Sequence, residues 1–351
     1  MKFIHIADVH LGAVPDKECS WSRERSQEIW DSFRDVIDRT GREQADLLLI
    51  AGDLFHRQPL MRELKEVNDL FSSIPDTKVV LIAGNHDYLK KDSYYLTYPW
   101  GRNVACLWEK MPSVVYFEEL DTYVYGLSYH SREILDGLYD ELRPQAEKGG
   151  IHILLAHGGD ETHIPIQKNR LKTAGFDYVA LGHIHKPEIV IPGKMAYAGA
   201  LEPIDRNDVG PHGFIRGECC DKKTVLQFVP FAKRSYVPLS VLVTPDMTQY
   251  SLEELVREQV QEAGERNLFR ISLKGLRDPQ WEIDRRRLYT LGNIVDVEDG
   301  TRANYCLEAL CQKYKGSLIG EYAEYFRKKE RTVIEEKALQ YGLEALLDAR
   351  K

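Results

Sequence analysis

The stretch "KVVLIAGNHD" occupies residues 78–87 and joins an apolar run to a polar turn. The apolar part does not alternate with polar residues, which is typical of a strand covered on both faces of a parallel sheet. It ends in Gly84, Asn85, His86 and Asp87. A turn alone explains such an ending, but the same construction recurs at other predicted strand ends of this chain.

The sequence on either side extends this pattern into an α/β fold. Strands are predicted at 2–7 and 46–53, and amphipathic helices at 21–44 and 60–73. Alternating strands and helices favour parallel strands with right-handed crossovers. From 114 to 231, short strand-like runs such as "IHILLAH", "GFIRG" and "TVLQFVPF" predict a second, mixed or antiparallel sheet packed on the first, with one helix near 131–147.

The pattern changes near residue 236, where a second domain is predicted. A strand near 237–244, a helix opening with a capping box from Ser251 to Glu254 and closing at Gly264, and the alternating strand "LFRISLK" form a small β-α-β unit. The predicted domains are a catalytic domain at 1–235, a cap domain at 236–316 and a charged helical tail at 317–351.

Composition indicates a soluble globular protein. Its 351 residues are 43% hydrophobic and 29% charged. No signal-peptide pattern opens the sequence, and no apolar run approaches the roughly 20 residues of a membrane span. We therefore expect a cytoplasmic protein without a membrane partner, and six cysteines that remain reduced. A net charge of −8 argues against nucleic-acid binding by bulk positive charge, but leaves room for a local basic surface.

Polar side chains gather directly after five apolar runs. They are Asp8 and His10 in "ADVH", Asp53 and His56 in "AGDLFH", Asn85, His86 and Asp87 in "AGNHD", His157 in "LLAHGG", and His183 and His185 in "LGHIH". Ligands of open α/β sheets bind beyond the carboxyl ends of the strands, so these residues are expected to line one pocket. Imidazole and oxygen ligands without thiolate suit divalent manganese, iron or zinc. An extended strand would aim Asp8 and His10 the same way, and Asp53 is the candidate carboxylate to bridge two ions.

Each of these residues has an ordinary explanation when taken singly. A strand-end aspartate often forms a turn, and a lone histidine is more often a hydrogen-bonded polar residue than a ligand. That reading is kept for His5, His130, His152, His163 and His212. Five such clusters in one chain are much harder to explain by turns, so a two-metal hydrolase is the preferred interpretation.

The motifs D-x-H, G-D, G-N-H-D, H-G-G and G-H-x-H occur in this order and resemble the calcineurin-like metallophosphoesterase superfamily over about residues 1–231. The resemblance implies a four-layer α/β/β/α sandwich with two divalent ions, manganese being expected first and iron, zinc or magnesium being alternatives. It implies one ion on Asp8, His10, Asp53 and His185, and another on Asp53, Asn85, His157 and His183. His86 would act on the substrate without binding metal, and Asp87 would orient His86.

Within the superfamily, "HIADVHLG" and "GDLFHRQPL" are most similar to the Mre11/SbcD-type DNA-repair nucleases, and the tail is similar to the YhaO-like exonuclease branch. This implies a metal-dependent DNA phosphodiesterase, a 3′-to-5′ exonuclease with single-strand endonuclease activity, in which His56 faces the substrate. It also implies a homodimer and an SMC-like ATPase as partner. Two interpretations stay open for the apolar face of Leu318, Ile319, Tyr322, Tyr325 and Phe326: it docks that partner, or it packs on the cap of this chain.

Two other functions fit the same sequence. A phosphatase or nucleotide phosphodiesterase on this core would hydrolyse small phosphate esters and would need no cap. A subunit that holds DNA ends for an ATPase would bind DNA without a catalytic role, although a complete ligand set weighs against it. Hydrolysis of mononucleotides but not DNA would favour the phosphatase.

Overall fold

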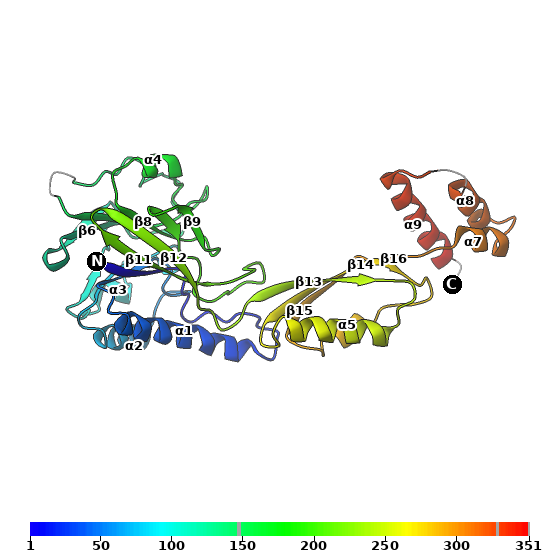
Figure 1. Cartoon of the computed structure of the whole chain (residues 1–351), viewed down its shortest axis with the longest axis horizontal. Helices are drawn as coiled ribbons and strands as arrows, with labels where there is room; N and C mark the ends of the chain where they lie inside the picture. The colour runs from blue at the N-terminus through cyan, green and yellow to red at the C-terminus, as the bar shows by residue number, and fades with distance from the viewer. Residues whose placement is uncertain (146–148, 328–329, 350–351) are drawn as a thin grey trace. The chain divides into compact units, whose positions relative to one another are not determined.

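The computed structural model describes residues 1–145, 149–327 and 330–349. The chain divides into two compact units, Met1–Tyr236 and the part from Val237 onward, which are described separately (Figure 1). Within the described ranges, no helix is long and apolar enough to cross a membrane.

The first sheet of unit 1 has six strands in the order β12-β11-β1-β2-β3-β4. Its strands are β1 (Lys2–Ile6), β2 (Leu47–Ala51), β3 (Lys78–Ile82), β4 (Val104–Cys106), β11 (Gly213–Cys220) and β12 (Lys223–Pro230). Strands β1 to β4 are parallel, as predicted. The β11–β12 hairpin was expected in the second sheet, and this expectation is wrong. It pairs antiparallel with β1, where it covers backbone groups that would otherwise form an open sheet edge.

The second sheet also has six strands, in the order β5-β6-β7-β8-β10-β9. Its strands are β5 (Ser113–Phe117), β6 (Thr122–Gly126), β7 (Ile151–His157), β8 (Tyr178–Gly182), β9 (Glu188–Ile191) and β10 (Met195–Tyr197). Parallel pairs in its centre and antiparallel pairs at both edges make it the predicted mixed sheet.

Apolar side chains of β2 show how the layers are held together. Leu48 and Ile50 belong to the core beneath the helices, whereas Leu47 and Leu49 belong to the core shared with the second sheet. Successive side chains of a strand point to opposite faces, so an unbroken apolar run is what a strand between two layers requires. This arrangement confirms the sandwich predicted for the first part of the chain.

Helices cover the outer faces of the sandwich. The helices of unit 1 are α1 (Ser22–Arg42), α2 (Met61–Ser72), α3 (Tyr94–Thr97), α4 (Lys168–Lys172) and the short 3-10 helix η1 (Glu118–Leu120). The first sheet is covered by α1 and α2. The helix expected near 131–147 does not form in residues 131–145, which are irregular apart from turns, bends and an isolated bridge between Ile134 and His163. Gly137 and Pro144 explain this, because glycine weakens a helix and proline interrupts its hydrogen bonds; residues 146–148 lie outside the described ranges.

Unit 2 contains a sheet of four strands and five helices within its described ranges. They are β13 (Tyr236–Val243, starting at the unit boundary), α5 (Gln249–Glu262), β14 (Leu268–Arg277), α6 (Arg285–Leu288), β15 (Ile294–Asp299), β16 (Arg302–Ala303), α7 (Leu307–Lys313), α8 (Leu318–Arg327) and α9 (Val333–Asp348). The predicted capping box is wrong by three residues. Thr248 caps α5 and pairs reciprocally with Ser251, because the helix begins before Ser251. Gly264 follows the helix with φ +91°, as its predicted role requires.

The predicted docking face on α8 is largely covered by the neighbouring helix. Ile319 and Phe326 are buried in a cluster with Leu339 and Leu343 of α9. Leu318 and Tyr325 remain exposed. The apolar face therefore packs mainly within the C-terminal helices.

Candidate metal centre and active site

Residues that follow five different strands meet in one cluster of unit 1. They are Asp8 and His10 after β1, Asp53 after β2, Asn85 after β3, His157 at the end of β7, and His183 and His185 after β8. The carboxyl ends of parallel strands lie at the same edge of a sheet, and here the ends of two facing sheets contribute. All seven predicted ligands are thus brought together.

Asp53 lies between the two halves of the cluster. One of its oxygens, Oδ1, accepts the main-chain N–H of His86 at 2.8 Å. The other, Oδ2, lies 3.8 Å from Nε2 of His10 and 3.5 Å from Nε2 of His157. A single carboxylate oxygen therefore faces one ring from each predicted ion site, which is the geometry that a bridging ligand needs.

Asn85 is the meeting point of the second half. Its Oδ1 lies 2.9 Å from Nε2 of His157 and 3.1 Å from Nδ1 of His183. The opposite nitrogens of these rings face acceptors, the carbonyl of Ala51 at 2.8 Å and the carboxylate of Asp160 at 2.7 Å. Both imidazoles therefore donate outward and present lone pairs to the Asn85 oxygen. The Asn85 oxygen and the two inward ring nitrogens are then all acceptors with no proton between them, and such a set suits a bound cation.

His10 and His185 form the first half together with Asp8. Their Nε2 atoms lie 3.1 Å apart, and both rings approach Asp8 within 4.8 Å. The outward nitrogens again have partners: Nδ1 of His10 lies 3.4 Å from Nδ1 of His56, and Nδ1 of His185 lies 3.1 Å from Oδ2 of Asp208. Burial alone would lower the pKa of His185, but the hydrogen bond to Asp208 and the charge of Asp8 raise it to about 9. Burial and the charge of His185 lower the pKa of His10 well below its ordinary value, so His185 is the ring of this pair that takes a proton. An ion bound here would replace that proton.

Burial shifts the pKa values of the carboxylates and imidazoles in the cluster. It raises the pKa of Asp8 to about 8 and also raises that of Asp53, because a carboxylate enclosed by protein loses the water that stabilises its charge. Burial lowers the pKa of His157 to about 3 and that of His183 to about 4, which keeps both rings neutral. Neutral imidazoles are the form that binds metal, and an ion would supply the positive charge that the carboxylates need.

Strained backbone aims several of these side chains. Asp8, His10, Asp53 and His183 have φ of 49°, 51°, 50° and 93°. Residues other than glycine rarely adopt this left-handed region, and such strain is concentrated at functional sites. The expected reason for the common direction of Asp8 and His10 is therefore wrong. Strand β1 ends at Ile6, and a strained turn, not an extended strand, aims the two residues.

Gly84 is needed for close approach. A Cβ at this position would lie 2.3 Å from Oδ1 of Asp53 and 2.7 Å from its main-chain nitrogen. Residue 84 is not among those with positive φ, so backbone freedom in the turn, the role expected from the sequence, is not what this position uses. The glycine lets the turn after β3 lie directly against the carboxylate of Asp53.

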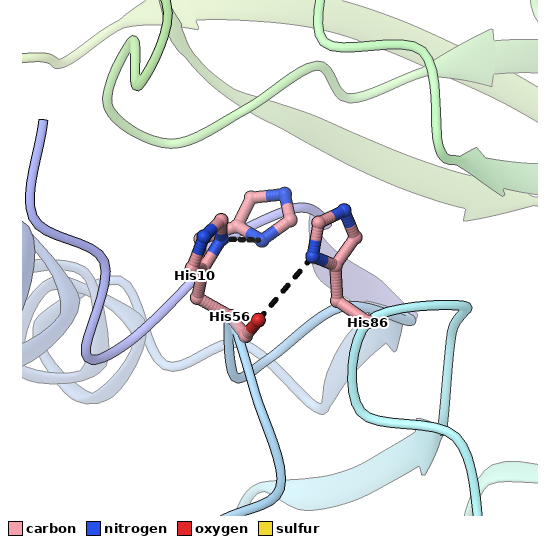
Figure 2. Close-up of side chains that lie close together, drawn as sticks. All are labelled: His10, His56 and His86. Atoms are coloured by element: carbon pink, nitrogen blue, oxygen red, sulfur yellow. Dashed lines mark hydrogen bonds between the residues drawn. The ribbon is translucent and has the colours of Figure 1, made fainter. Parts of the chain in front are cut away.

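His56 and His86 form the side of the cluster next to His10 (Figure 2). Their rings stack with centroids 4.9 Å apart, and the ring of His86 lies 4.8 Å from that of His10. Nδ1 of His86 donates toward the main-chain oxygen of His56 at 3.3 Å. The two rings are only partly buried, which leaves part of each ring accessible from outside the protein.

Asp87 does not orient His86 as expected. Its Oδ1 accepts the N–H of Gly84 at 2.8 Å, and its Oδ2 accepts the N–H of Phe55 at 3.1 Å and the hydroxyl of Tyr95 at 2.8 Å. These donors hold a fully buried carboxylate below the turn. Asp87 therefore fixes the backbone that carries Asn85 and His86, and the carbonyl of His56 takes the orienting position.

Sequence reasoning missed Asp160 and Asp208, the outer partners of His183 and His185. Asp160 also contacts His163, whose ring lies 4.5 Å from that of His183. A signal existed for Asp160, because it follows the H-G-G motif directly. Nothing in the spacing of Asp208 points to His185, which is 23 residues away.

Similarity to known proteins agrees with this donor set. Residues 1–187 match the family described as calcineurin-like phosphoesterase. The chain is 28% identical over 218 residues to the DNA double-strand break repair protein Mre11 of Methanocaldococcus jannaschii, which covers 59% of this chain and 58% of that protein.

Two further relatives match this chain with similar identity and coverage. The uncharacterized metallophosphoesterase YhaO of Bacillus subtilis is 28% identical over 237 residues, which covers 61% of this chain and 56% of YhaO. The Mre11 protein of Archaeoglobus fulgidus is 30% identical over 237 residues, which covers 58% of this chain and 51% of that protein. The chain thus spans about half the length of these relatives. Since the family match covers more than half of the chain, this protein belongs to the calcineurin-like phosphoesterase family.

Proposed function

We propose that this protein is a two-metal-dependent phosphodiesterase that acts on DNA. The observation that carries the proposal is the convergence of imidazole, amide and carboxylate acceptors on two adjacent points that share Asp53. Asp8, His10, Asp53 and His185 would hold one ion, and Asp53, Asn85, His157 and His183 the other. Two divalent ions bound there would polarise the scissile phosphate and activate water for in-line attack.

His86 is proposed as the group that acts on the departing oxygen. The carbonyl of His56 accepts its Nδ1–H. A proton for the departing oxygen is then a second one, on Nε2, so His86 would act as an imidazolium that becomes neutral when it gives the Nε2 proton away. Stacking on His56 holds the ring in place. Proton transfer by a positioned side chain contributes about 10²–10⁴-fold to the rate.

His56 is proposed as a substrate-binding residue. When Nε2 of His10 binds metal, its Nδ1–H faces Nδ1 of His56 at 3.4 Å. His56 then accepts at Nδ1 and carries its own proton on Nε2, from which it can donate to a phosphate oxygen. The pair would help to select a diester in the correct orientation.

DNA is proposed as the substrate on two grounds. The Mre11 relatives are DNA double-strand break repair proteins by name. Unit 2 carries basic residues on one strand and one short helix, namely Arg270 and Lys274 on β14 and Arg285 to Arg287 on α6. Arg287 is paired with Glu253, so Arg285 and Arg286 are the better candidates for phosphate contacts. The 3′-to-5′ polarity, single-strand cleavage and preference for manganese are part of this proposal.

A nuclease assay on end-labelled duplex and single-stranded DNA tests the proposal. Cleavage should require Mn²⁺ or Mg²⁺, stop with chelator and fall steeply as salt rises, since each phosphate contact adds a salt-dependent increment. Replacing Arg285 and Arg286 with alanine should lower the salt slope by about one per lost contact. The exposed Arg62 of α2 gives the matched control, Arg62→Ala. Hydrolysis of mononucleotides with no cleavage of DNA would replace the proposal with the phosphatase.

A partner protein is also proposed for the exposed residues of α8. Leu318 and Tyr325 remain accessible, and the resemblance to nucleases that work with an SMC-like ATPase suggests such an occupant. Leu318→Glu should weaken co-elution with the ATPase while leaving diester hydrolysis unchanged. Unchanged co-elution would remove α8 from the interface.

Self-association into a homodimer is a separate proposal, which sedimentation of the purified chain tests.

A further inference from the structure

Two carboxylates outside the proposed ligand set each hold one histidine of the "GHIH" motif. Oδ2 of Asp160 accepts from Nε2 of His183 at 2.7 Å. The carboxylate of Asp208 accepts from Nδ1 of His185, with its two oxygens at 3.2 and 3.1 Å. The two neighbouring histidines are thus held through opposite ring nitrogens.

Both carboxylates are themselves fixed by backbone donors. Oδ1 of Asp160 accepts the N–H groups of Thr162 and His163, both at 2.8 Å. Oδ2 of Asp208 accepts the N–H groups of Ile204 and Asp205, both at 3.0 Å. An anchored acceptor can fix the rotation of an imidazole as well as its tautomer.

Because His183 is held at Nε2 and His185 at Nδ1, the two rings turn different nitrogens toward the cluster. With its proton on Nε2, His183 presents Nδ1 to Asn85. With its proton on Nδ1, His185 presents Nε2 to His10. The inward nitrogens therefore reach different halves of the cluster, although the two histidines are only two residues apart.

We propose that Asp160 and Asp208 are positioning residues that each serve one metal ion. Asp160 serves the ion of Asn85, His157 and His183, and Asp208 serves the ion of Asp8, His10 and His185. This inference rests on the proposed two-metal function. It adds that two residues outside the ligand set each support a different one of the two ions.

The surroundings of the two carboxylates support this division. Asp160 bonds to His183, whose other ring nitrogen faces Asn85 in the same half of the cluster. Asp208 bonds to His185 in the other half. The side chain of Asp160 is 42% exposed and that of Asp208 is 11% exposed. Water can replace an exposed acceptor more easily, so the loss of Asp208 should have the larger effect.

Calorimetric titration of the metal-free full chain with Mn²⁺ tests the proposal. Wild type should bind two ions, and Asp160→Asn and Asp208→Asn should each weaken one of them, by about 10–100-fold, the usual cost of losing an outer partner. An amide can offer an N–H to the ring and so favour the wrong tautomer. Asp160→Glu keeps an anionic acceptor and should recover part of the affinity. Glu161→Gln removes a charge from the adjacent residue and should leave both affinities unchanged.

The Asn85→Ala background identifies which ion each carboxylate serves. This variant should keep only the ion of Asp8, His10 and His185. Adding Asp208→Asn should weaken that remaining ion, whereas adding Asp160→Asn should not. Nitrogen chemical shifts of the histidines in the metal-free protein give a second readout, since the proton of His183 should move from Nε2 in Asp160→Asn.

The outcomes separate this inference from the proposed function. If wild type binds two ions and both asparagine variants bind them as tightly, with unchanged histidine tautomers, the positioning roles are wrong and the metal site stands. If both variants weaken the same ion, the division between the two ions is wrong. If wild type binds no divalent ion, the proposed function and this inference fail together.

Discussion

Gly84→Ala should disable the centre without removing any proposed ligand. The added Cβ would lie 2.3 Å from Oδ1 of Asp53, whereas ordinary contacts begin near 3.4 Å. Asp53 is buried, and its Oδ1 accepts from His86, so it cannot swing into open space. Relief therefore requires the bridging carboxylate or the turn after β3 to move by about 1 Å.

A displacement of this size is large for catalysis. Misplacing reacting groups by about 1 Å can cost on the order of 10²-fold in rate. We expect kcat for an activated phosphodiester, bis-p-nitrophenyl phosphate, to fall by about 100-fold or more, together with weaker binding of both ions because Asp53 is shared.

The comparison variant is Gly101→Ala, whose added Cβ would meet side-chain atoms of Asn103, Asn68 and Ser72 at 3.3 Å or more, none of which belongs to this cluster. It should keep near-wild-type rate and metal binding. A folded Gly84→Ala protein with two tightly bound ions and a normal rate would refute the argument that Gly84 maintains the Asp53 geometry.

Two further predictions concern histidines with different roles. His86→Ala should keep both ions by elemental analysis while kcat falls by about 10²–10⁴-fold; loss of an ion would make His86 a ligand. His5 is buried against the hydroxyl of Tyr178, and burial lowers its pKa to about 3. Unfolding lets it bind a proton near its ordinary pKa of about 6.5, so the free energy of unfolding should decrease as pH falls from about 6.5 toward 3, by up to about 1.4 kcal/mol per pH unit. With chelator present, His5→Gln should show a shallower decrease in denaturant titrations, and parallel curves for variant and wild type would show that His5 is not the source.

The sequence predicts the strands, and which polar residues meet beyond their ends, because both follow from local patterns. Apolar runs of β2 and β3 identify strands buried on two faces, and a polar residue after each run marks the sheet edge where ligands meet. The same patterns cannot show how the side chains are aimed. Asp8, His10 and Asp53 have a left-handed φ, which few residues other than glycine adopt, and no local pattern of the sequence marks these three positions for it.

Contacts between distant segments explain the remaining differences. The alternating pattern of the β11–β12 hairpin would suit either sheet. The hairpin joins the first sheet because β11 pairs with the free edge of β1, which the local sequence does not reveal. Asp87 was expected beside His86 because they are adjacent in sequence, but donors from Phe55 and Tyr95 hold it elsewhere. Asp208 reaches His185 through the fold, so no short motif contains the pair.

The metal content of wild type and Asp53→Asn decides whether the carboxylate of Asp53 is shared by two ions. Each purified protein is loaded with Mn²⁺, freed of excess metal and measured for bound manganese per chain, with cleavage of duplex DNA recorded on the same sample. Wild type should hold two ions and cleave DNA. Asp53→Asn should lose at least one ion and cleavage, because the shared carboxylate supplies charge to both ions. A variant that retains two ions and a near-normal rate would contradict the bridging centre on which this account depends.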